Sequence, residues 1–125
     1  MKVFYDKDCD LGLIKNKHVG IIGFGSQGHA HALNLRDSGI QVSVGLRKTG
    51  ESWKKAEATG LDVVEVDELV KKSHIIMILA PDTSQKKIYE DSIKDNIEPG
   101  KYLAFGHGFN IHYNQIVPEE GVNVF

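Results

Sequence analysis

The sequence has one cysteine, three prolines and no long hydrophobic run, and each shortage excludes a class of protein. Cys9 cannot form an internal disulfide, so we interpret it as a small half-buried residue in a protein of a reducing compartment. The longest apolar run, residues 75–80, is much shorter than the roughly 20 residues that span a bilayer. The first residues form neither an apolar signal segment nor an Arg- and Ser-rich presequence. We expect a cytoplasmic protein with no membrane partner.

Basic residues are not in excess either. Fifteen Lys and Arg against seventeen Asp and Glu give a net charge of -2, without the basic surface that nucleic-acid binding requires. We therefore expect no nucleic-acid partner. With 125 residues and 41% apolar side chains, the chain can form one domain with its own core.

Short apolar runs alternate with segments of helical spacing. Strands are predicted at 19–22, 41–44, 63–64, 74–79, 102–105 and 122–125, and helices at 26–38, 53–59, 68–72 and from 82 to about 97. Gly39 is expected to follow the end of the first helix, Asp67 to cap the third, and Asp82 with Gln85 to form a capping box. This alternation predicts a doubly wound α/β domain of the Rossmann type, a mainly parallel sheet with helices on both faces.

A glycine fingerprint follows the first predicted strand. Gly23, Phe24, Gly25, Ser26, Gln27 and Gly28 fit the pattern G-x-G-x-x-G between a strand and a helix. There Gly23 would allow the tight turn, Gly25 the close approach of a pyrophosphate, and Gly28 close helix packing. A helix N-terminus favours phosphate because its free amides and dipole both present positive charge. The pattern predicts a dinucleotide site, against the alternative of a glycine-rich turn without a ligand.

The end of the second strand indicates which dinucleotide binds. Arg47 and Lys48 stand where an NAD site usually carries an acidic residue, and Thr49 and Ser52 add hydroxyl groups. Two cations with hydroxyls favour a 2′-phosphate and therefore NADPH, whereas the alternative is a solvated basic turn.

His107 is the histidine with the most suggestive position. It follows the fifth predicted strand between Gly106 and Gly108, at the sheet edge where ligands bind in such folds. It is therefore a candidate catalytic residue, although a loop histidine without a function remains the alternative. His29 and His31 point to different sides of a helix and are assigned to packing or the surface, and His18, His74 and His112 are given no function. No metal-ligand spacing and no nucleophilic triad is present in this chain.

Several strings together resemble one enzyme family. They are D-K-D-C-D-L at 6–11, G-F-G-S-Q-G-H-A-H-A at 23–32, V-G-L-R at 44–47, S-W at 52–53, A-P-D at 80–82 and F-G-H-G-F-N-I at 105–111. The chain is similar over nearly its whole length to the N-terminal NADPH-binding domain of ketol-acid reductoisomerase, also called acetohydroxyacid isomeroreductase.

The resemblance implies an NADP-dependent oxidoreductase of valine, leucine and isoleucine biosynthesis. It would convert 2-acetolactate or 2-aceto-2-hydroxybutyrate to the 2,3-dihydroxy acid by Mg²⁺-dependent alkyl migration and reduction by NADPH. Residues implied to contact NADPH are Phe24, Gly25, Ser26, Gln27, Arg47, Ser52, Asp82, Thr83, Ser84 and Gln85, and His107 is implied as the active-site histidine.

The chain departs from this family in two respects. Gly50 stands where the family commonly has a serine, so one 2′-phosphate contact would be either missing or taken over by Thr49. The family's Mg²⁺ ligands lie in an all-helical C-terminal domain, which also forms the homo-oligomer and has no counterpart in residues 1–125. We expect a fragment, cut within or just after the sixth strand and inactive alone. The alternatives are an NADP-linked hydroxyacid-type reductase and a non-catalytic dinucleotide-sensing module.

Overall fold

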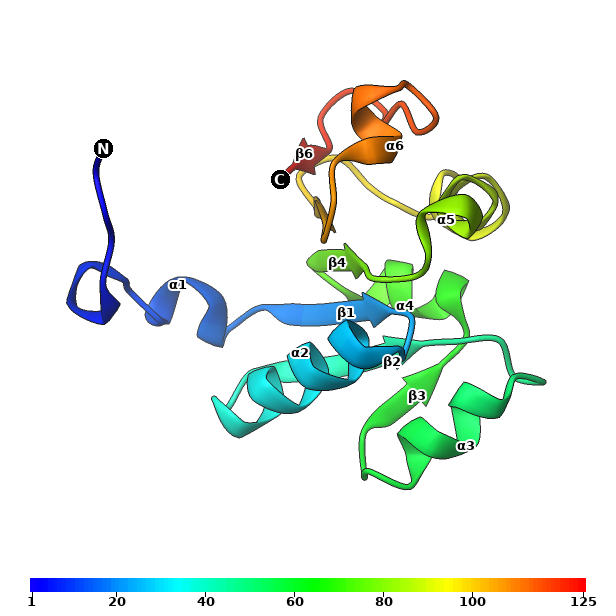
Figure 1. Ribbon diagram of the computed structural model, residues 1–125, viewed down its shortest axis with the longest axis horizontal. Helices are drawn as coiled ribbons and strands as arrows, with labels where there is room; N and C mark the ends of the chain where they lie inside the picture. Colours follow the sequence, from blue (N-terminus) through cyan, green and yellow to red (C-terminus); the bar gives the residue numbers. More distant parts are fainter.

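The computed structural model describes residues 1–125 and contains one six-stranded sheet (Figure 1). The strands are β1 (His18–Ile22), β2 (Gln41–Gly45), β3 (Asp62–Val64), β4 (Ile75–Ile78), β5 (Tyr102–Phe105) and β6 (Asn123–Val124). Their order is β3-β2-β1-β4-β5-β6, and every neighbouring pair is parallel. This order is that of the Rossmann fold, so the predicted fold class is confirmed and the sheet is entirely parallel.

Helices cover both faces of the sheet. They are α1 (Gly12–Lys15), α2 (Ser26–Asp37), α3 (Glu51–Glu57), α4 (Val66–Lys72), α5 (Asp82–Ile88), the π-helical turn η2 (Tyr89–Ile93) and α6 (Phe109–His112), with a short 3₁₀ turn η1 (Asp6–Asp8). Helix α2 packs on β1 and β2, and α3 on β3, whereas α4, α5, η2 and α6 belong to the opposite face. None of these helices is long and apolar enough to cross a membrane.

Alternating side chains of the central strands pack into two apolar clusters, one on each face of the sheet. Ile22, Ile76 and Ile78 pack with α4 and η2 on one face, whereas Val19 and Ile21 pack with α2 on the other. This alternation follows from the two-residue repeat of a strand. Both faces of β1 are buried, which explains why it reads as a continuous apolar run rather than as alternating apolar and polar residues.

Three local predictions were wrong. Asp67 does not cap α4, because the helix already begins at Val66, and no side chain caps it. Asp82 does not open a capping box, because Pro81 takes the extended N-cap position and Asp82 is the first helical residue. The helix from Asp82 does not run unbroken to residue 97, since it changes to π-helical geometry at Tyr89. The predicted end of α2 is confirmed: Gly39 follows it with φ of 78°.

Polar side chains form a network at the amino edge of the sheet. The buried Ser43 hydroxyl donates to Asp62 at 2.5 Å and lies 2.8 Å from His18 Nε2, and Lys72 Nζ lies 2.6 Å from the same carboxylate. Because the hydroxyl has only one proton, His18 must donate to it. The hydrogen bonds from Lys72 and Ser43 hold the pKa of Asp62 below its usual value. Burial, then the charge of Lys72, lowers the pKa of His18.

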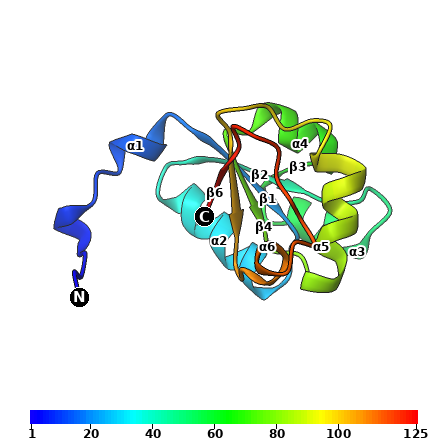
Figure 2. The same ribbon diagram turned by 90° about the horizontal axis from the view of Figure 1, so that it is seen from above.

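Residues 1–17 form an arm that leads away from the sheet in both ribbon views (Figures 1 and 2). Almost all of it is exposed, and Ile14 is the arm residue that packs against the core. Cys9 lies on this arm and is exposed, so its interpretation as half-buried was wrong. The composition gave no indication that the residues around it would lack packing partners.

Candidate functional site

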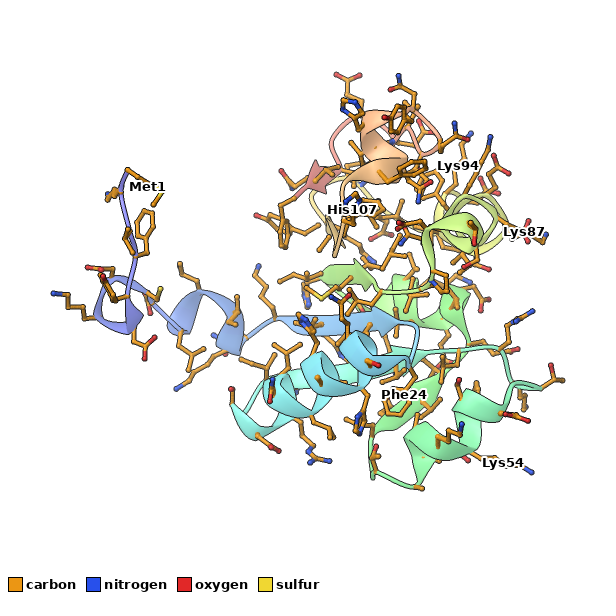
Figure 3. The ribbon with its side chains drawn as sticks, viewed as in Figure 1. Met1, Phe24, Lys54, Lys87, Lys94 and His107 are labelled. Carbon is orange, nitrogen blue, oxygen red and sulfur yellow. The ribbon has the colours of Figure 1, made fainter.

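A cavity of about 1010 Å³ opens at the carboxyl edge of the sheet. The loops after β1, β2, β4 and β5 line it, as expected for ligand sites in open parallel sheets. Twelve of the thirteen predicted site residues line this cavity: Gly23, Phe24, Gly25, Ser26, Gln27, Arg47, Ser52, Asp82, Thr83, Ser84, Gln85 and His107. Figure 3 shows two of them, Phe24 after β1 and His107 after β5. The thirteenth, Gly28, is buried beneath the fingerprint loop.

The three fingerprint glycines have three different surroundings. Gly23 has φ of 104°, and an added Cβ would lie 2.9 Å from Ala80 N, so the backbone conformation and the space both require glycine. At Gly28 a Cβ would collide with the Gly23 carbonyl, so glycine lets α2 pack directly on the loop. At Gly25 a Cβ would meet no protein atom within 4 Å. Gly25 therefore borders open space in the cavity wall.

The N-terminus of α2 meets the cavity without a cap. Gly25 is its N-cap residue, and no side chain bonds to the first turn. The amides of Ser26 and Gln27 belong to the first turn, whose N–H groups have no acceptor within the helix, and both residues line the cavity. The N-terminus of this twelve-residue helix presents free N–H donors and the positive end of the helix dipole, a combination suited to binding phosphate.

The loop after β2 contributes a cation and a hydroxyl. Arg47 and Ser52 line the cavity, whereas Lys48 and Thr49 are exposed outside its lining. The Gly50 amide donates to the Arg47 carbonyl at 2.9 Å, which closes a tight turn before α3. An added Cβ at Gly50 would lie 3.2 Å from that carbonyl, which is tighter than an ordinary van der Waals contact.

The loop after β4 forms the opposite wall. Asp82, Thr83 and Ser84 reach the cavity from the first turn of α5, and the Ser84 hydroxyl donates to the Pro81 carbonyl at 2.8 Å. Gln85 also borders the cavity, but it is only 2% exposed and its amide nitrogen donates to the Ala80 carbonyl at 2.8 Å. Its side chain therefore supports the wall more than it faces the opening.

His107 lies on the cavity rim directly after β5 and is exposed. The Phe109 amide donates to His107 Nδ1 at 3.2 Å, so this nitrogen is an acceptor. In the neutral ring the proton is then on Nε2. The structure thus gives the imidazole one defined orientation and leaves Nε2 without a protein partner.

Sequence reasoning missed the apolar part of the cavity. Leu46, Val66 and Ile88 contribute lining from the ends of β2, α4 and α5, and Lys87 pairs with Asp91 at 2.5 Å nearby. Leu46 could have been found as the residue before Arg47. Val66 and Ile88 could not, because their place in the cavity depends on how two helices from the other face meet the strand ends.

The remaining histidines lie on α2, at the amino edge of the sheet and on α6. His29 and His31 are exposed, and the ring of His29 contacts Phe24 edge to face with centroids 5.1 Å apart. His18 and His74 belong to the amino edge, where the His18 amide donates to His74 Nδ1 at 2.9 Å. No three His, Cys, Asp or Glu side chains come together as a metal site. The residues of this chain therefore do not fit a Mg²⁺ centre.

Comparisons with known proteins agree on one family. Residues 13–125 match the NADPH-binding domain of acetohydroxy acid isomeroreductase. The chain is 60% identical over 124 residues to the NADP(+) ketol-acid reductoisomerase of Psychrobacter sp. (strain PRwf-1), and equally to that of Psychrobacter arcticus. These alignments cover 99% of this chain but 37% of each relative, so the chain spans just over a third of their length.

Solved structures give the same result. An NADH-preferring ketol-acid reductoisomerase from an uncultured archean superposes with a TM-score of 0.95 at 40% identity, covering 99% of this chain and 39% of that one. A putative oxidoreductase from Jannaschia sp. CCS1 has a TM-score of 0.75 at 17% identity, over 86% of this chain and 39% of its own. The second likeness shows only the shared fold.

Proposed function

The chain belongs to the family of NADPH-binding domains of acetohydroxy acid isomeroreductases, and we propose that it binds NADPH for such an enzyme. The reaction would convert 2-acetolactate or 2-aceto-2-hydroxybutyrate to the 2,3-dihydroxy acid in the biosynthesis of valine, leucine and isoleucine. The observation that carries the proposal is the uncapped N-terminus of α2 beside the open space at Gly25. Because the chain spans 37% of its relatives' length, turnover would need the longer polypeptide.

The residues of this chain would hold the cofactor in three places. The first-turn amides at Ser26 and Gln27 would donate to the pyrophosphate, which the positive end of α2 also attracts. Leu46, Val66 and Ile88 would offer an apolar surface for the adenine ring, and Leu46 directly precedes Arg47. Asp82 and Thr83 would border the dinucleotide along the other wall.

Arg47 and Ser52 would bind the 2′-phosphate. Both line the cavity, and a guanidinium can form paired charge-assisted hydrogen bonds to a phosphate. Gly50 contributes no side chain, and Thr49 lies outside the cavity lining, so the phosphate would have fewer side-chain donors than the sequence predicts. We therefore propose a preference for NADPH that depends mainly on Arg47.

His107 would act at the reacting end of the cofactor. When bound, NADPH supplies a hydride to the substrate carbonyl. The imidazole lies on the cavity rim with Nε2 free, so it can exchange a proton with a substrate oxygen. On one side of His107, Gly108 borders open space, whereas a Cβ at Gly106 would lie 3.0 Å from Leu79 Cδ2. Mg²⁺ has no ligand set among these residues.

A chimera tests the proposal. The chain replaces its matching segment in the 60% identical Psychrobacter enzyme, and consumption of 2-acetolactate is measured with NADPH and Mg²⁺. We expect turnover by the chimera and its loss in the His107→Ala chimera, while NADPH binding persists. A folded chimera that binds no NADPH, or a His107→Ala chimera as active as its parent, contradicts the assignment.

Two further expectations remain proposals. We propose a cytoplasmic enzyme, supported by the absence of any possible internal disulfide in a chain whose one cysteine is exposed. We also propose that the longer polypeptide forms a homo-oligomer through segments outside residues 1–125. Size-exclusion chromatography with light scattering of the chimera measures its oligomeric state.

A further inference from the structure

Two buried amide side chains join the loops that form the walls of the cavity. Gln85 on α5 and Asn110 on α6 are each 2% exposed. Asn110 Nδ2 donates to Gln85 Oε1 at 2.9 Å, across a sequence separation of 25 residues. A buried amide that loses its partner remains desolvated without a hydrogen bond, so breaking this bond destabilises the folded state.

Each member of the pair is also bonded to the backbone after β4. Asn110 Nδ2 donates to the Asp82 carbonyl at 3.0 Å, and Gln85 Nε2 donates to the Ala80 carbonyl at 2.8 Å. The start of α6 is thereby attached to the start of α5 and to the strand end before it. We call Gln85 and Asn110 together the amide clasp.

The clasp acts on the residue that orients His107. Phe109, whose amide donates to His107 Nδ1 at 3.2 Å, immediately precedes Asn110 in α6. Fixing Asn110 therefore fixes the amide that holds the imidazole. The same clasp holds the α5 residues lining the opposite wall, so one pair of side chains sets the histidine relative to the proposed cofactor site.

We propose that Gln85 and Asn110 are positioning residues that hold His107 as its Nε2–H tautomer, facing the cofactor-binding wall of α5. Neither side chain needs to contact the substrate for this role. The inference deepens the proposed function and rests on it for the importance of His107. It differs from a purely structural role, because a structural pair would affect the stability of the fold without affecting the protonated nitrogen of one ring.

The first measurement follows the tautomer without any cofactor. Nitrogen-15 NMR of the histidine rings in the 125-residue chain distinguishes the protonated from the unprotonated ring nitrogen. We expect the neutral ring of His107 to be mainly Nε2–H in the parent and a mixture of both tautomers in Asn110→Ala. The matched control is Asn96→Ala, because Asn96 lies in the turn after η2 and its Nδ2 donates only locally, to the Ser92 carbonyl at 2.9 Å.

The second measurement is NADPH affinity by calorimetry. Loosening the wall of α5 should raise the Kd about 3- to 10-fold in Asn110→Ala, the effect of about one net hydrogen bond, and not in Asn96→Ala. If Asn110→Ala does not fold, Gln85→Met removes the same bond from the other side with a chain of similar length. A folded Asn110→Ala or Gln85→Met chain with the parent's His107 tautomer overturns the clasp.

The two proposals fail in different ways. A parent chain that binds no NADPH contradicts the proposed function, whereas the tautomer measurement still decides the clasp. A parent that binds NADPH but whose His107 tautomer is unchanged in both clasp variants contradicts the clasp and leaves the cofactor assignment intact.

Discussion

Replacing Gly25 by alanine should separate cofactor binding from stability. Gly25 has ordinary extended backbone angles, φ of -78° and ψ of -164°, so alanine fits there without backbone strain. No protein atom lies within 4 Å of the added methyl group. The methyl group would instead occupy the space through which a pyrophosphate would approach α2.

The two expected magnitudes differ in size. Alanine is a poorer N-cap than glycine but restricts the unfolded chain, so the two effects offset and the free energy of unfolding should change by less than about 0.5 kcal/mol. A methyl group forced against a tightly bound ligand costs about 1–3 kcal/mol, which raises the Kd for NADPH about 5- to 150-fold.

Calorimetric titration with NADPH and urea unfolding measure the two quantities. Gly28→Ala is the contrasting variant: its Cβ would collide with the Gly23 carbonyl, so it should lose both stability and affinity. If Gly25→Ala binds NADPH as tightly as the parent, the pyrophosphate does not lie beside α2. If it unfolds as easily as Gly28→Ala, the space around Gly25 is not open.

Three further predictions concern the β2 loop, the packing of the sheet and pH. Arg47→Asp should reverse the preference for NADPH over NADH because it replaces the phosphate-binding cation by an anion; equal Kd values for the two cofactors in the parent would refute this. Gly20→Ala should lower the free energy of unfolding by about 1–3 kcal/mol in urea, since its Cβ collides with Leu69 and Ser73, whereas an unchanged midpoint would show that α4 can shift. Folding lowers the pKa values of both His18 and Asp62. The free energy of unfolding should therefore begin to fall below pH 6.5, where the unfolded chain binds a proton at His18 more readily than the folded chain does. It should fall again below pH 3.8, for the same reason at Asp62. The second decrease should be absent in Asp62→Asn. It should be kept in the control Asp37→Asn, because Asp37 pairs with Arg36 on the surface. The free energy of unfolding, measured across this pH range for both variants, would show whether these expectations fail.

The sequence predicts the fold well because the residues that favour a strand locally are also the residues that are buried in the sheet. Ile21 and Ile22 lie on opposite faces of β1 and both are fully buried, so an apolar run there can only be a central strand. The fingerprint is equally readable, since Gly23 needs glycine for its positive φ and Gly28 needs it because a Cβ would collide with the Gly23 carbonyl five residues earlier.

Features that depend on distant segments were not predictable. The helix after Pro81 begins one residue earlier than a capping box allows, because the proline itself supplies the extended N-cap. Gln85 and Asn110 read as ordinary polar residues, and only the meeting of α5 and α6 makes them a buried pair. Val66 and Ile88 enter the cavity where α4 and α5 meet the strand ends, so the apolar lining was not predictable either.

The network at the amino edge and the cavity at the carboxyl edge lie at opposite ends of the same strands. Along β1, four residues separate His18 in the network from Ile22 in the cavity lining, which is about 13 Å. At that separation, without a shared contact, the free-energy effects of substitutions should add. Residues of the amino-edge network can therefore change in evolution without a change in the Kd for cofactor. They can also be re-engineered to raise the free energy of unfolding. Selection on thermal tolerance and selection on coenzyme choice would then act on different residues of one sheet.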